Sequence, residues 1–199
     1  MLAAIEFTLR GTAFVYQGQE IGMTNTNIKF DQSKDMVVNM LYQTLRDKHV
    51  PNGLARKIAL SEGRDVVRTP MQWSSDKYAG FSSHQPWLPV NRNCETISVE
   101  QQEGDDSSVL SFYRRMIGLR KSSLALQDGT IKFYDDKKPI MSYLRQFGQQ
   151  KILVVANLSY KNVRPITELH GHIIANSYEG QTEFDDGILQ PYEVVIMEL

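Results

Sequence analysis

The residues best suited to chemistry lie in a stretch without helical or strand periodicity, residues 64–73, whose sequence is Arg-Asp-Val-Val-Arg-Thr-Pro-Met-Gln-Trp. Arg68 is the strongest candidate, because a guanidinium is always charged and its planar donors can hold two neighbouring hydroxyls or a carboxylate in a fixed orientation. The structural alternative is that Arg64 and Asp65 fix the loop while Arg68 pairs with a buried carboxylate. Composition alone favours this structural alternative.

Two tryptophans and one glutamate are further candidates for binding a polar ligand. The rings of Trp73 and Trp87 can stack on a sugar face, but a tryptophan close to a proline more often packs its own loop. Glu20 can bind a polar ligand or hold the loops around one. The second role is favoured for Glu20, since one carboxylate does not form a catalytic pair.

Other kinds of site are not indicated by the sequence. His170 and His172 would share a face of a strand, but no carboxylate or thiolate cluster accompanies them, so neither a metal nor a cofactor is expected. The single cysteine, Cys94, stands beside Glu95 rather than beside a cation that would activate it. The sequence also lacks the glycine-rich phosphate loops, the nucleophile elbow and the helical zinc motif of common enzymes.

Composition and charge exclude several classes of protein. The chain has 22 Lys+Arg and 23 Asp+Glu, a formal net charge of −1, and 41% hydrophobic residues. This balance is typical of a globular protein and argues against nucleic-acid binding, which needs a clustered excess of basic residues. Spanning a membrane needs about 20 apolar residues, and no run of that length is present. We therefore expect no nucleic-acid or membrane partner and, since no leader is visible, a cytoplasmic location.

The elements that must position these residues change in character along the chain. Residues 12–16 are β-branched and aromatic and predict a buried strand, whose C-terminal end leads into polar residues 17–23, where α/β folds meet ligands. Around this strand the sequence predicts helices at residues 1–10, 35–48 and 54–60 and a long ordered loop over residues 63–92.

A domain boundary is expected after residue 126. The clearest helix follows Asp105, Asp106 and Ser107, which can cap it, and it presents one broad apolar face. The pattern then changes to short strands separated by turns, at residues 129–134, 140–147, 151–158, 172–175 and 193–199. The predicted fold class is thus α/β over residues 1–126, followed by a small antiparallel β-sandwich or barrel over residues 127–199.

Three segments together resemble a known family. Residues 16–23, residues 64–73, and residues 79–81 with Pro86 and Trp87 are similar to the C-terminal third of α-glucosidases of glycoside hydrolase family thirteen, the α-amylase superfamily. The resemblance is to the oligo-1,6-glucosidase, isomaltase and dextran glucosidase branch in particular. It extends to the family's last barrel helix at residues 108–121 and its final domain strand at residues 189–193. One departure is Gln19, where relatives usually have Glu.

This resemblance implies a fold and a set of site residues. Residues 1–126 would be the incomplete C-terminal part of a (β/α)8 TIM barrel, with its eighth strand at residues 12–16, and residues 127–199 would be the family's all-β domain. Arg68 would bind hydroxyls of the non-reducing terminal glucose, which helps to make the enzyme exo-acting. Glu20, Asp65 and Trp73 are weaker substrate-site candidates, which the resemblance implies would orient the loop.

The resemblance also implies a function and a missing partner. A complete barrel needs about 250 residues and eight strands, so the chain is expected to be a fragment. The family's Asp nucleophile, Glu acid/base and further Asp match no segment here, so no catalytic residue is assigned. We expect the C-terminal part of a retaining, exo-acting α-glucosidase that hydrolyses α-1,6 or α-1,4 bonds of oligosaccharides. It is expected to be inactive without the N-terminal part of its barrel.

Two alternatives remain open at the level of sequence. One is a non-catalytic module similar to the heavy chain of an amino-acid transporter, which is expected to lose Arg68 while keeping residues 70–73. The other is a trehalose synthase or sucrose-cleaving relative, which shares the fold and chemistry. The presence of Arg68 favours an enzyme over the transporter module.

Overall fold

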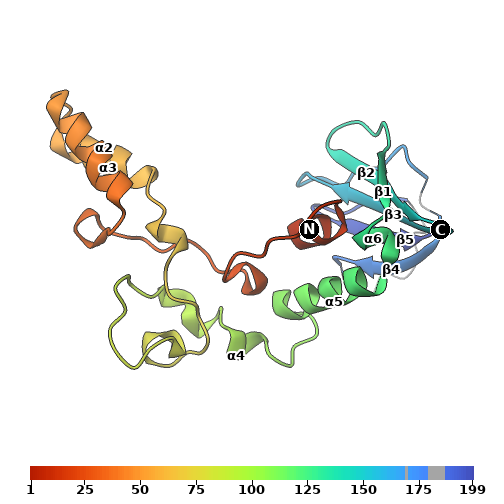
Figure 1. The fold of residues 1–199 in the computed structure, drawn as a ribbon, viewed down its shortest axis with the longest axis horizontal. Coiled ribbons are helices and arrows are strands. Elements are labelled where there is room, and N and C mark those ends of the chain that lie inside the picture. The colour runs from red at the N-terminus through yellow and green to blue at the C-terminus, as the bar shows by residue number, and fades with distance from the viewer. Residues whose placement is uncertain (169, 179–186) are drawn as a thin grey trace. The chain divides into compact units, whose positions relative to one another are not determined.

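The computed structural model describes residues 1–168, 170–178 and 187–199. The chain forms two compact units, one of Met1–Val15 with Ser111–Leu199 and one of Tyr16–Leu110 (Figure 1). These two units are defined by contacts within the structure. The boundary after residue 126 was predicted for the domains of the family, and it stays a prediction. Across the described ranges, no helix combines the length and the apolar character needed to cross a membrane.

Most of the expected elements are present. In chain order the helices and strands are α1 (Leu2–Thr8), α2 (Met36–Asp47), α3 (Asn52–Ser61), α4 (Val99–Gln102), α5 (Val109–Ser122), α6 (Leu124–Gln127), β1 (Thr130–Phe133), β2 (Ile140–Phe147), β3 (Gln150–Asn157), β4 (His172–Asn176) and β5 (Val194–Glu198). The four expected helices and the five strands expected after residue 126 are confirmed, with shifted ends. The short helices α4 and α6 were not expected from the pattern.

The strand predicted at residues 12–16 is wrong. The backbone there forms no regular strand, and the Phe14 side chain is 81% exposed rather than buried. A strand is held by hydrogen bonds to a neighbouring strand, and within the described part of the chain no strand pairs with these residues. The β-branched and aromatic residues therefore favour extended backbone, but these residues have no partner strand among the described residues.

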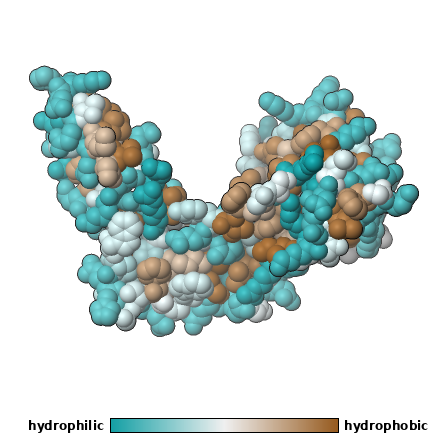
Figure 2. Space-filling view, viewed as in Figure 1, coloured by the Kyte–Doolittle hydropathy of each residue, from teal (hydrophilic) through white to brown (hydrophobic). Residues whose placement is uncertain are grey.

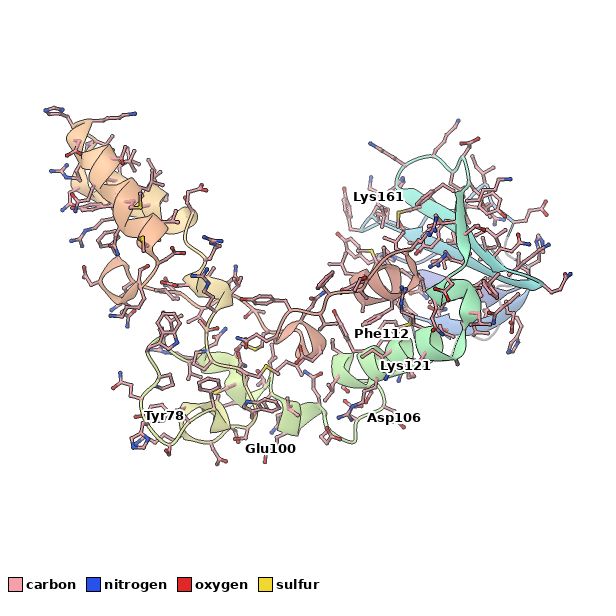
Figure 3. All side chains as sticks on the ribbon, in the orientation of Figure 1. Tyr78, Glu100, Asp106, Phe112, Lys121 and Lys161 are labelled. Atoms are coloured by element: carbon pink, nitrogen blue, oxygen red, sulfur yellow. The ribbon has the colours of Figure 1, made fainter. Side chains whose placement is uncertain are left out.

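The unit of residues 16–110 contains a helical hairpin and a long irregular loop. Helices α2 and α3 pack against each other, and apolar side chains gather along one face of the hairpin (Figure 2). Asp35 begins α2, because its carboxylate accepts a hydrogen bond from the Val37 N–H at 2.9 Å. The following loop has little regular structure, as expected, and it carries the Tyr78 side chain (Figure 3). The hairpin and the loop supply the residues of the candidate site.

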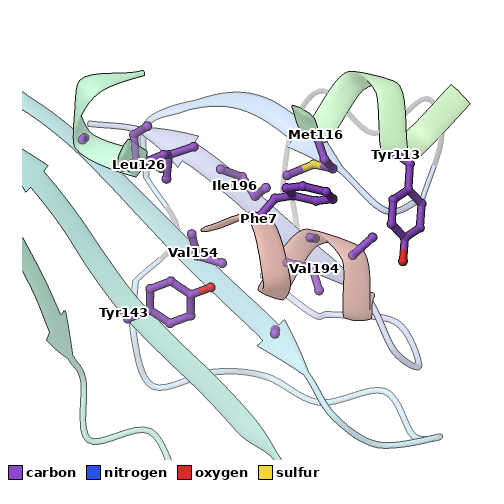
Figure 4. Close-up of a cluster of buried hydrophobic side chains, with 13 residues drawn as sticks. Phe7, Tyr113, Met116, Leu126, Tyr143, Val154, Val194 and Ile196 are labelled. Atoms are coloured by element: carbon purple, nitrogen blue, oxygen red, sulfur yellow. The ribbon is translucent and has the colours of Figure 1, made fainter. Parts of the chain in front are cut away.

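The other unit is centred on an antiparallel sheet of five strands in the order β1-β2-β3-β5-β4. The central strand β3 is buried on both faces, which explains its continuous apolar run from Ile152 to Ala156. Val154 on one face contacts the cluster that includes Phe7 of α1 and Met116 of α5 (Figure 4). Irregular segments carrying Leu189 cover the other face. The antiparallel sheet is thus confirmed, and the β-sandwich stays a prediction.

Two polar side chains of β2 connect the sheet to its neighbours. Arg145 is fully buried, and its guanidinium donates hydrogen bonds to the carbonyls of Thr8, Gly129 and Thr130 at 2.5, 3.1 and 3.2 Å. The Tyr143 hydroxyl lies 2.6 Å from Thr8 Oγ1, and burial raises the pKa of Tyr143 to about 12. These contacts fix the end of α1 and the start of β1 against β2.

Candidate functional site

The candidate site begins with a tight turn in the loop of residues 64–73. Asp65–Val67 forms one turn of 3-10 helix, and the Arg68 N–H closes it by donating to the Asp65 carbonyl at 3.0 Å. Residues three apart in such a turn lie on the same side. Arg68 Nη1 accordingly lies 3.9 Å from Asp65 Oδ1, so the local backbone sets this ion pair.

Asp35, the residue that begins α2, supplies a second carboxylate to Arg68. Its Oδ2 lies 3.7 Å from Arg68 Nη1 and accepts a hydrogen bond from the Arg64 N–H at 2.9 Å. The N–H groups of Arg64 and Val37 hold the pKa of this carboxyl below its ordinary value, with a further contribution from the Arg68 charge, against the opposing effect of burial. Asp35 is therefore ionised at neutral pH.

Asp65 joins the start of the helical hairpin to the same loop. Its Oδ2 accepts hydrogen bonds from Ser33 Oγ at 2.9 Å, from the Lys34 N–H at 2.7 Å and from the Asp35 N–H at 2.9 Å. The side chain is almost fully buried. Asp65 therefore organises the segment that carries Asp35 and does not face solvent itself.

The Arg68 guanidinium is oriented but not saturated. Its side chain is 38% exposed, and both ion pairs are longer than hydrogen bonds. With the described residues, no hydrogen bond uses its N–H donors. Pairing with a buried carboxylate, the structural alternative drawn from the sequence, is thus observed for both Asp35 and Asp65. The same pairing fixes the direction of the guanidinium and leaves donors available to the hydroxyls of a ligand.

The loop around Arg68 also contacts residues 16–23, another of the segments that carry the family resemblance. Gln17 Nε2 donates to the Thr69 carbonyl at 3.2 Å. A pocket of 260 Å³ lies between residues 16–25 and the side of the loop that carries Val66, Val67 and Thr69. Two segments that are 52 residues apart in the sequence are therefore neighbours.

Glu20 and Trp73 lie in the same unit as Arg68, but no hydrogen bond or ion pair among the described residues connects either of them to it. Glu20 sits in the 3-10 turn Gln19–Ile21, and its Oε2 is buried without a hydrogen-bond partner in the described chain. The Trp73 side chain is 51% exposed, while its backbone N–H donates to the Ala79 carbonyl at 2.9 Å. Gln72, the residue before Trp73, is buried, and its side-chain amide donates to Asn93 Oδ1 at 3.2 Å. The roles of Glu20 and Trp73 toward a ligand stay predictions.

Asp35 is the site residue that sequence reasoning missed. An Asp just before an amphipathic pattern is a signal for a helix N-cap, and that signal was present. Its burial beside Arg68 depends on a backbone contact with Arg64, 29 residues away, which no local pattern encodes. Within residues 1–168, 170–178 and 187–199, no group of three or more His, Cys, Asp or Glu side chains is placed to hold a metal ion.

Comparisons with known proteins give consistent matches. Residues 1–129 match the family described as Alpha amylase, catalytic domain. Probable oligo-1,6-glucosidase 2 of Bacillus subtilis (strain 168) is 36% identical over 202 residues, which cover 97% of this chain and 36% of that relative. Glucan 1,6-alpha-glucosidase of Streptococcus pneumoniae serotype 4 is 34% identical over 194 residues, covering 96% of this chain and 36% of that relative.

Solved structures are similar over almost the whole chain. Isomaltulose synthase from Klebsiella sp. LX3 aligns with a TM-score of 0.89 and 27% identity, covering 99% of this chain and 37% of that one. A mutant isomaltulose synthase from Erwinia rhapontici NX5, solved with its natural substrate sucrose, aligns with a TM-score of 0.86 and 30% identity over 99% of this chain and 37% of that one. The chain thus spans little more than a third of the length of each of these proteins.

Proposed function

Because this chain belongs to the alpha-amylase family of glycoside hydrolases, we propose that it supplies part of the sugar-binding wall of a retaining, exo-acting α-glucosidase. Its substrates are α-1,6- or α-1,4-linked oligosaccharides, cleaved at the non-reducing end. The names of the curated relatives, oligo-1,6-glucosidase and glucan 1,6-alpha-glucosidase, support this class of substrate. The observation that carries the proposal is the Arg68 guanidinium, which two buried carboxylates orient and whose N–H donors remain free to bind hydroxyls.

Arg68 is proposed to bind adjacent hydroxyls of the terminal glucose. A planar guanidinium can reach two neighbouring oxygens at once, so it fixes the position and the rotation of the ring. Asp35 and Asp65 keep the guanidinium from turning toward solvent. We call Arg68, with the Asp35 and Asp65 carboxylates that orient it, the Arg68 clamp. A glucose that carried a further sugar unit on the same side would collide with this clamp, and this collision would explain a preference for chain ends.

The bond-breaking acids are proposed to lie on other polypeptide that completes the barrel. A retaining mechanism uses two carboxyl groups about 5 Å apart, one as the nucleophile and one as the acid/base. Asp35 and Asp65 do not fit these roles, because both are buried and already accept hydrogen bonds from the backbone. We expect the 199-residue chain by itself to release no product from a nitrophenyl α-glucoside.

The finer architecture belongs to the same proposal. Residues 1–126 form the C-terminal part of a (β/α)8 barrel. Residues 127–199 form the all-β domain, a small β-sandwich. The match of residues 1–129 to the catalytic-domain family and the antiparallel sheet that follows support this division.

A chimera tests the proposal. The matching C-terminal third of the Bacillus subtilis relative is replaced by this chain, and hydrolysis of isomaltose is measured. Arg68→Lys keeps the charge but removes the planar fork, so kcat/KM is expected to fall about tenfold to a hundredfold, the equivalent of losing one or two charge-assisted hydrogen bonds. Arg46→Lys is the matched control, because Arg46 lies on the exposed side of α2 and donates to the Val50 carbonyl. Equal activity of both variants would reject the clamp.

The structural comparisons favour one second candidate. Isomaltulose synthases, one of them solved with sucrose, are similar to this chain at 27% and 30% identity. A sucrose-converting enzyme would use the same clamp on the glucosyl half of sucrose. Incubating the same chimera with sucrose distinguishes the two, since an isomerising enzyme forms a new disaccharide and a hydrolase releases glucose and fructose.

A further inference from the structure

A second polar pocket lies in the unit of residues 16–110, outside the contacts of Arg68. Its volume is 470 Å³, within the range of about 300–1,000 Å³ that is usual for small-molecule sites. Two aromatic rings, Tyr78 and Trp87, line it together with prolines. Its polar lining comes from Asp31, Gln32, Lys34 and Gln85. This combination of apolar rings and a mixed polar rim has no role in the clamp described above.

The Trp87 ring is presented to solvent rather than used for packing. Trp87 is 61% exposed, whereas the next residue, Leu88, is 1% exposed and anchors the segment. The sequence favours a packing role for this tryptophan, and the structure does not show one. A pyranose ring has an apolar face of C–H groups, and an exposed indole offers a flat apolar surface of matching size.

A strained turn carries the second ring, that of Tyr78. Tyr78 and Ala79 both have left-handed backbone angles, with φ of 59° and 56°, which side-chain-bearing residues rarely adopt. The turn persists because the Ala79 carbonyl accepts hydrogen bonds from the N–H groups of Trp73 and Ser74 at 2.9 and 3.1 Å. The backbone that carries Tyr78 is therefore positioned before any ligand arrives, which lowers the entropy lost on binding.

The polar rim suits a neutral ligand that both donates and accepts hydrogen bonds. One carboxylate and one ammonium face the pocket, so no net charge favours an anion or a cation. Asp31 Oδ1 lies 3.8 Å from Arg56 Nη1 and its side chain stays 78% exposed. Gln32 Oε1 accepts from the Lys29 N–H at 3.1 Å, which leaves the Gln32 amide N–H groups free. Gln85 makes no hydrogen bond with the described residues. Sugar hydroxyls match such a mixed rim.

The pocket and the Arg68 clamp share one short segment. Asp31, Gln32 and Lys34 line the pocket, while Ser33 and the backbone N–H groups of Lys34 and Asp35 donate to the Asp65 carboxylate. Within residues 31–35, some residues thus face the pocket and others support the clamp, and Lys34 does both, with its side chain and its backbone N–H respectively. A ligand that occupies the clamp has this pocket as its neighbour along residues 31–35.

We propose that the Trp87 pocket binds a further glucopyranose unit of the oligosaccharide, stacked on the Trp87 indole and hydrogen-bonded to Asp31, Gln32 and Gln85. The identity of the sugar rests on the proposed function. The binding itself uses none of the Arg68 contacts, so it is measurable on the 199-residue chain without hydrolysis. The pocket would set the preference for longer oligosaccharides over disaccharides.

The chain's two tryptophans allow a direct binding experiment. Trp73→Phe leaves Trp87 as the single indole reporter, and Trp87→Phe leaves Trp73. Titrating the Trp73→Phe protein with isomaltotriose is expected to give a saturable change in indole emission, and the Trp87→Phe protein is expected to give none. Gln85→Ala, which removes one side chain of the rim, is expected to weaken binding at least threefold. Glycerol, which has hydroxyls but no ring face, is the control ligand.

Two results would overturn the proposal. One is the absence of a saturable response of Trp87 at millimolar isomaltotriose, in a protein whose circular dichroism matches the parent chain. The other is an equal response from Trp73 in the Trp87→Phe protein. If this binding fails while the chimera still loses hydrolysis through Arg68→Lys, the pocket is rejected and the proposed function stands.

Discussion

Replacing Asp65 by alanine tests whether this carboxylate organises the candidate site. Asp65 is 3% exposed and accepts hydrogen bonds from Ser33 Oγ and from the N–H groups of Lys34 and Asp35. Hydrogen bonds to a charged group contribute about 1.5–3 kcal/mol each, and breaking a buried ionic contact costs about 3–5 kcal/mol in total because the losses are not additive. We therefore expect Asp65→Ala to lower the free energy of unfolding of the unit of residues 16–110 by about 3–5 kcal/mol.

The control for this substitution is Ser33→Ala. It removes one of the donors and leaves the carboxylate with the two backbone N–H groups. We expect a loss of about 1–2 kcal/mol. The difference between the two variants separates the role of the carboxylate from a general effect of truncating a side chain in this segment.

Urea unfolding followed by tryptophan fluorescence is the appropriate assay. Both tryptophans, Trp73 and Trp87, belong to the unit of residues 16–110, so the signal reports on that unit. With a slope of about 2 kcal/mol/M, a loss of about 4 kcal/mol lowers the urea midpoint by about 2 M. A urea midpoint for Asp65→Ala that equals that of Ser33→Ala would refute the reasoning, because the carboxylate would then contribute no more to stability than its hydrogen bond with Ser33.

Two further predictions follow from buried charges. Arg145→Met is expected to destabilise the strand unit by about 2–4 kcal/mol, because the carbonyls of Thr8, Gly129 and Thr130 lose their donor; thermal melting by circular dichroism measures it, and an unchanged melting temperature would contradict it. The pKa of Asp35 is lower in the folded chain than its unfolded value of about 3.9, so the carboxylate contributes stability above that pH, and this contribution is lost as the pH falls through the folded pKa. Asp35→Asn is expected to flatten the acid side of a stability profile followed by fluorescence, and an equally steep profile in the variant would count against the assignment.

The strands were predictable because their signals are local. β3 carries a continuous apolar run from Ile152 to Ala156, which marks a strand covered on both faces, and turn residues delimit its neighbours. The same kind of signal failed at residues 12–16. Composition reports a preference for extended backbone, whereas a formed strand also needs a partner strand at hydrogen-bonding distance.

The site was predictable only in part. Arg68 was a candidate from the chemistry of its side chain, and only the family resemblance favoured a binding role, which stays a prediction. Its tight turn with Asp65 follows from residues close in sequence. Asp35 was missed, because its contact with Arg64 bridges 29 residues and depends on how the hairpin folds back. The exposure of Trp87 was also not foreseen, since the type of residue does not decide which of two neighbours, Trp87 or Leu88, is buried.

The central claim is that the Arg68 guanidinium binds hydroxyls of the terminal glucose. Its most direct test is a cycle of substrate and enzyme changes in the chimera, measured as kcat/KM for an aryl α-glucoside and for its analogues that lack single hydroxyls of the glucose. Arg68→Lys is expected to reduce kcat/KM about tenfold or more on the intact sugar, and to have little further effect on the analogue that lacks the bound hydroxyl. An equal reduction on the intact sugar and on every deoxy analogue would contradict the account.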